Sequence, residues 1–133
     1  MIQTYKELKD LILNKKEIER EITSQLRAIE KHTTDILNSE GIEPVEVKAR
    51  IDIFEYNYTE DEIVLTVEIF DYAFNGEELK EITKIMEKEG FKFDIIDYDF
   101  KEDGDYTLKR VKAGFIKNLW GDKNKKEKTR KNL

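Results

Sequence analysis

The side chains that could do chemistry in this sequence are one histidine and many carboxylates. His32 is the only histidine, and it lies between Lys31 and Thr33 in a segment with helical spacing. Catalysis by an imidazole needs a nucleophile, a metal or a second acid–base group beside it. Neither Ser24 nor Ser39 lies in the strand–turn–helix context of an activated serine. We therefore expect His32 to be an exposed helical residue and the protein not to be an enzyme.

Aspartates gather between residues 94 and 105. A calcium loop that starts at Asp99 would place Gly104 correctly at its tight turn. It would also place Lys101 and Arg110 at positions that must supply carboxylate oxygens, which rules that alignment out. The chain has no cysteine and no glycine-rich phosphate loop. We therefore predict no metal and no cofactor, and expect these acids to be solvated strand and turn residues.

Charge is segregated along the chain, whose net charge is −6. Residues 1–38 carry seven basic and seven acidic side chains. Residues 39–106 carry seven basic and twenty-one acidic side chains, and residues 107–133 carry ten basic and two acidic ones. The acidic middle repels phosphates and favours a basic partner. The basic end could contact nucleic acid, dock on an acidic surface or stay solvated, and the sequence leaves these alternatives open. Its candidate polyanion contacts are Lys109, Arg110, Lys112, Lys123, Lys125, Lys126, Lys128, Arg130 and Lys131.

Aromatic side chains fall on the polar side of two predicted strands. Phe54 and Tyr56 follow the first strand, and Phe70 and Tyr72 lie opposite the apolar side of the second. In a hairpin both pairs could share a face with Lys48. Such a face can stack single-stranded RNA, but acidic residues interleave here and no RNP-like motif is present. We predict that these four aromatic residues belong to the core or to a protein–protein interface.

The first element is a predicted helix over residues 5–38. At ~1.5 Å per residue it would span ~50 Å, against ~36 Å for a compact domain of this size. The helix must therefore break, near residues 14–16, or project from its own domain. Ile22, Ile29 and Ile36 are spaced seven residues apart, as in a weak coiled-coil seam. The helix is thus expected either to lie on its own sheet or to mediate self-association.

The rest of the chain predicts strands and a second helix. Alternating apolar residues indicate hairpins over residues 45–72 and 91–116, and helical spacing indicates a helix over 76–89. The order αββαββ predicts an α+β, two-layer fold with both helices on one face of a four-stranded antiparallel sheet. This is a permuted ferredoxin-like order by topological analogy alone, and the strand order stays open. Residues 1–120 are expected to form one domain and residues 121–133 a disordered basic tail.

These features favour a non-catalytic interaction protein of the adaptor, inhibitor or viral accessory type. We expect a homo-oligomer, with a dimer favoured, formed through the long helix or an aromatic sheet face, and a basic protein as a further partner. The alternative is a nucleic-acid-associated protein that contacts phosphates through the Lys-rich C-terminal segment. No apolar run approaches the ~18 residues of a membrane span, and the N-terminus lacks the apolar core of a signal peptide. A cytoplasmic location is therefore expected.

Overall fold

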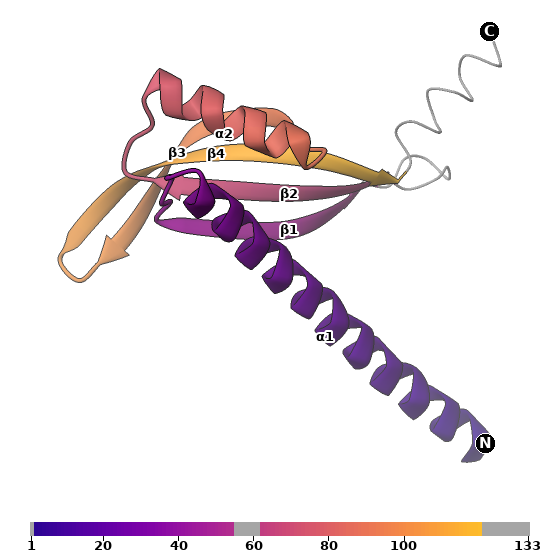
Figure 1. Cartoon of the computed structure of the whole chain (residues 1–133). Coiled ribbons are helices and arrows are strands. Elements are labelled where there is room, and N and C mark those ends of the chain that lie inside the picture. Colours follow the sequence, from indigo (N-terminus) through magenta and orange to yellow (C-terminus); the bar gives the residue numbers. More distant parts are fainter. Residues whose placement is uncertain (1, 55–61, 121–133) are drawn as a thin grey trace, which may run out of the picture.

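The computed structural model describes residues 2–54 and 62–120, without the side chains of residues 2–9, 11, 12 and 120 (Figure 1). The predicted α+β fold is confirmed: two helices and a four-stranded antiparallel sheet occur in the order αββαββ. The predicted tail, residues 121–133, lies outside the described residues. In chain order the elements are α1 (Ile2–Ser39), β1 (Glu46–Phe54), β2 (Glu62–Asp71), α2 (Gly76–Lys88), β3 (Lys92–Asp103) and β4 (Tyr106–Trp120).

Helix α1 is continuous over 38 residues, so the break considered near residues 14–16 does not occur. It ends at Ser39, and the chain turns at Gly41, whose φ of 79° suits glycine; the Ile42 N–H donates to the Leu37 carbonyl at 2.9 Å. Figure 1 shows that the N-terminal half of α1 extends well past the sheet. Of the two arrangements expected for an over-long helix, the structure adopts the projecting one.

The sheet has the strand order β1-β2-β4-β3, with every neighbouring pair antiparallel. Strands β2 and β3 are therefore parallel, with β4 between them and α2 as the crossover. This split β-α-β unit is the one that the ferredoxin-like motif contains. The sequence could not supply this order, because αββαββ permits several pairings.

The core lies between the two helices and one face of the sheet. β1 presents Val47, Ala49 and Ile51 to this face, because successive residues of a strand point to opposite sides. We call it the helix face, and the opposite side the outer face. The buried core residues are Leu37, Ile42, Leu65, Val67, Ile69, Ile82, Met86, Phe91, Ala113 and Phe115.

Helix α1 also covers the edge of β1. The Glu30 carboxylate accepts a hydrogen bond from the Ala49 backbone N–H at 2.8 Å, and Arg27 bonds the same carboxylate at 2.8 Å. An edge strand exposes unpaired backbone groups that invite other strands. One of those groups on β1 is thus occupied by a side chain of the chain's own helix.

Candidate protein-binding groove

The apolar stripe of α1 changes from buried to exposed along the helix. Leu37 is fully buried, and Leu26 and Ile29 pack against the core. Ile22 and Ile18 continue the same helical face toward the N-terminus, yet they are 42% and 59% exposed. The apolar stripe therefore continues past the end of the sheet, where no other part of the described chain packs over it.

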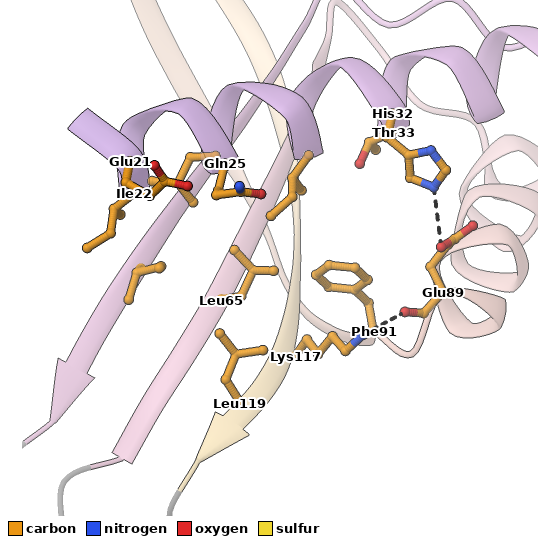
Figure 2. A pocket seen from close by; sticks show the side chains of 13 residues that line it. Glu21, Ile22, Gln25, His32, Thr33, Leu65, Glu89, Phe91, Lys117 and Leu119 are labelled. Atoms are coloured by element: carbon orange, nitrogen blue, oxygen red, sulfur yellow. Dashed lines mark hydrogen bonds and ion pairs between the residues drawn. The ribbon is translucent and has the colours of Figure 1, made fainter. Parts of the chain in front are cut away.

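A groove of about 500 Å³ opens where α1 leaves the sheet. Figure 2 shows Ile22 and Gln25 on the helix side, with Leu65 and Leu119 facing them from the sheet. Leu119 is 48% exposed at the mouth. The apolar walls are formed by Ile22, Leu26 and Ile29 of α1 and by Ile51, Leu65 and Leu119 of the sheet.

Polar side chains close the inner end of the groove (Figure 2). His32 Nε2 lies 3.4 Å from a Glu89 carboxylate oxygen, across from α1 to the end of α2. Lys117 Nζ donates to the Glu89 backbone carbonyl at 3.3 Å and lies 5.8 Å from the centre of the Phe91 ring. These contacts join α1, the end of α2 and β4 at one point. His32 is an exposed helical residue, with 60% of its side chain accessible, as the sequence predicts.

The chemistry of this groove suits binding of apolar side chains. Its lining is mainly apolar, and it also includes polar side chains, among them Gln25 and Thr33 of α1. Concave, mainly apolar surfaces with a few polar groups are typical of recognition sites. In the part of the chain that the structure describes, no cluster of three His, Cys, Asp or Glu side chains could hold a metal ion.

The seven-residue spacing in α1 identifies part of this groove. Ile22 and Ile29 both line it. Ile36 lies further along the helix and is half-buried, away from the groove. The seven-residue spacing did not predict Ile18 as an interaction residue, because Ile18 does not belong to that series. Its position four residues before Ile22, on the same helical face, was the available signal.

The aromatic residues predicted as an interface do not form one patch. Phe54 pairs with Glu62 at one end of the first hairpin, and Phe70 lies opposite Glu46 at the other. Phe54 is 46% exposed, whereas Phe70 is 3% exposed. Tyr72, just beyond β2, is 59% exposed, and Tyr56 lies outside the described residues.

Phe70 is buried on the outer face by cations. The Arg110 guanidinium lies 4.5 Å from the centre of its ring, and Lys48 Nζ lies 5.5 Å from it. Arg110 also binds Glu46 at 2.7 Å and Asp99 at 2.5 Å. The residues Glu46, Asp99 and Arg110, here called the Arg110 triad, connect both edge strands to β4.

Ion pairing sets the protonation of the Arg110 triad. Hydrogen bonds from Arg110 hold the pKa of the Glu46 carboxyl below its usual value, against the opposing effect of burial. The same donor lowers the pKa of Asp99, and the two carboxylates raise the pKa of Arg110. Both acids are therefore ionised at neutral pH.

The described members of the predicted polyanion site have intramolecular partners. Arg110 is 4% exposed within its triad. Lys112 Nζ lies 3.1 Å from the Glu68 carboxylate, and Lys109 Nζ lies 4.0 Å from the centre of the Tyr98 ring. The other predicted cations lie outside the described residues, and they are Lys123, Lys125, Lys126, Lys128, Arg130 and Lys131.

A search of protein-family models, of curated proteins and of solved structures finds no match to this chain. No helix within residues 2–54 and 62–120 is both long and apolar enough to cross a membrane.

Proposed function

We propose that the protein is a non-catalytic interaction protein that self-associates through α1 and the adjoining groove. The observation that carries this proposal is the exposure of Ile18 and Ile22 on a helical face that is buried further along α1. Apolar surface that continues a core stripe into solvent is typical of protein–protein interfaces.

The projecting half of α1 gains little from its own domain. Helices in proteins owe most of their stability to packing of an apolar face, and short isolated helices are marginal in water. Covering an exposed isoleucine contributes about 1–2 kcal/mol at ~25 cal/mol per Å² of apolar surface. A partner along Ile18, Ile22 and the groove would supply the packing that the sheet does not.

Charge permits a second copy as that partner. Residues 1–38 carry seven basic and seven acidic side chains, so two copies of α1 do not repel one another overall. Lys15 and Glu19 are exposed on the side of α1 that carries Ile18 and Ile22. An antiparallel pair places Lys15 of one copy opposite Glu19 of the other, whereas a parallel pair in register opposes like charges. We therefore favour a two-fold, antiparallel dimer.

Light scattering on matched variants tests the dimer. The full chain should show twice the monomer mass, and the double variant Ile18→Asp/Ile22→Asp should show the monomer mass. Leu13→Asp is the control, because Leu13 is 47% exposed but lies nine residues from Ile22, about half a turn out of phase at ~100° per residue. This control should remain dimeric.

Two outcomes would contradict self-association through α1. One is a strictly monomeric full chain at high concentration. The other is a dimer that survives Ile18→Asp/Ile22→Asp, since this result would place the interface elsewhere. Circular dichroism should confirm that all three chains keep their helix content.

The direction of the pairing can be measured separately. The chain has no cysteine, so Asp10→Cys introduces a unique site for a spin label. An antiparallel dimer centred at Glu17, as the pairing of Lys15 with Glu19 requires, separates the two labels by roughly 20 Å along the helices, whereas a parallel dimer leaves them roughly 10 Å apart. A short distance in a pulsed dipolar measurement would overturn the antiparallel arrangement but not the dimer.

A further inference from the structure

Each edge of the sheet has one backbone N–H that is occupied by a side-chain carboxylate. At the β1 edge, the Glu30 carboxylate occupies the Ala49 N–H. At the other edge, β4 is the one neighbour of β3 among the described strands, and the Asp97 carboxylate accepts a hydrogen bond from the Tyr98 N–H at 2.8 Å. A bulge between Phe93 and Ile95 disturbs the start of β3, and the register with β4 is then continuous to Asp103. This second part of β3 is a long edge of the kind that accepts an added strand.

Side chains along this edge alternate in character. Ile96, Tyr98 and Phe100 lie on the helix face, as shown by the register of Ile96 with the core residue Ala113, and they are 42%, 59% and 64% exposed. Asp97 and Asp99 lie between them and point to the outer face. The edge therefore offers an apolar row on one face and an acidic row on the other.

The charge of β3 selects among strands that could pair with it. The strand carries two lysines and five acids, a net charge of −3. On the outer face Asp99 binds Arg110, its register partner in β4, and Asp97 is in register with Lys112, whose Nζ lies 3.1 Å from Glu68. A strand added on the free side with basic residues would repeat this cross-strand pairing. If the added strand were β3 of a second copy, two strands that each carry a net charge of −3 would lie side by side. Their repulsion disfavours pairing between copies.

We propose that the β3 edge binds an extended basic segment of a partner protein by strand addition. Backbone hydrogen bonds to β3 supply affinity, and alternate side chains supply specificity. The segment would carry apolar residues on the helix-face side, against Ile96, Tyr98 and Phe100. It would carry Lys or Arg at the intervening positions, against Asp97 and Asp99. This surface is separate from the α1 groove, so the proposal does not depend on self-association.

A short fluorescent peptide in which valine and lysine alternate is the probe. It should bind the full chain in an anisotropy titration, and a peptide of the same composition with the valines and lysines in two blocks should bind far more weakly. Asp97→Lys and Phe100→Lys should each weaken binding about twofold to fivefold, through loss of one cross-strand pair. Glu43→Lys makes the same charge change as Asp97→Lys at an exposed position in the connection between α1 and β1, and should bind like the unaltered chain.

The same titration on the Ile18→Asp/Ile22→Asp variant separates this proposal from the dimer, because binding should persist in a monomer. Amide hydrogen exchange should slow at residues 95–101 when the peptide is bound. Equal binding of the alternating and block peptides would overturn the proposal, as it would indicate attraction by net charge alone. Unchanged binding in both β3 variants would also overturn it. Dissociation of a dimer of the full chain by Phe100→Lys would overturn it as well, because this result would make the β3 edge a contact between copies.

Discussion

The two faces of the sheet are stabilised by different interactions. The helix face is apolar, and Val67, Ile69 and Phe115 are completely buried there beneath the helices. The outer face carries a hydrogen-bonded network of charges in which Arg110 connects Glu46 of β1 to Asp99 of β3. The first face is stabilised mainly by burial of apolar surface, whereas on the second the ion pairs of Arg110 connect three strands. The two faces should therefore respond to different perturbations.

The largest effect is expected on the helix face. Phe115→Ala removes a fully buried ring that also packs edge-on against Phe93, with ring centres 5.7 Å apart. The free energy of unfolding should fall by about 3–5 kcal/mol, because the change leaves a cavity that the sheet cannot close. Denaturation by urea measures it. A loss below about 1 kcal/mol would mean that this face is less tightly packed than the structure indicates.

A smaller effect is expected from breaking the outer face. Arg110→Met keeps much of the apolar contact with Phe70 but leaves Glu46 and Asp99 without their shared donor. The free energy of unfolding should fall by about 1–2 kcal/mol, less than for a fully buried pair, because both carboxylates are about one-third exposed. Lys109→Met is the control, since this exposed neighbour lacks a carboxylate partner among the described residues. Equal losses in the two variants would contradict a special role for Arg110.

The smallest effect concerns pH, and it should depend on the outer face alone. The pKa values of Glu46 and Asp99 are lower in the folded protein than in the unfolded chain. Their stabilisation is therefore fully present above the unfolded values near pH 4, and is lost as pH falls through the folded values. Urea midpoints measured from about pH 6 to pH 2 should fall less steeply for Arg110→Met than for the unaltered chain or for Phe115→Ala. Parallel curves for all three chains would show that the Arg110 triad does not contribute.

The same contrast explains what the sequence could predict. The helix face follows from local patterns. The apolar stripe of α1, followed by Gly41, predicts a helix and its buried side. The alternation of apolar and polar residues in β1 and β2 predicts two strands and their buried sides. The outer face follows from contacts between distant residues. Glu46 is 64 positions from Arg110, and sequence reasoning placed Arg110 among cations available to a polyanion. Its burial depends on the strand order, which no local pattern contains.

The groove combines both kinds of information. Its helix wall, Ile22 and Ile29, could be predicted from spacing along α1. Its sheet wall could not, because Leu65 and Leu119 become neighbours only when β2 lies beside β4. The exposed residues of β3 were assigned to a strand correctly, but their accessibility depends on β3 being at the edge rather than in the centre.

The length of α1 would also determine how a dimer engages its partners. Two antiparallel copies of a 38-residue helix would act as a spacer that keeps the two sheets at opposite ends of one particle. Each β3 edge would then be free to take its own ligand, which makes the assembly bivalent. A protein with two basic segments on a linker of matching reach would gain avidity from the raised effective concentration of the second segment, without any new contact.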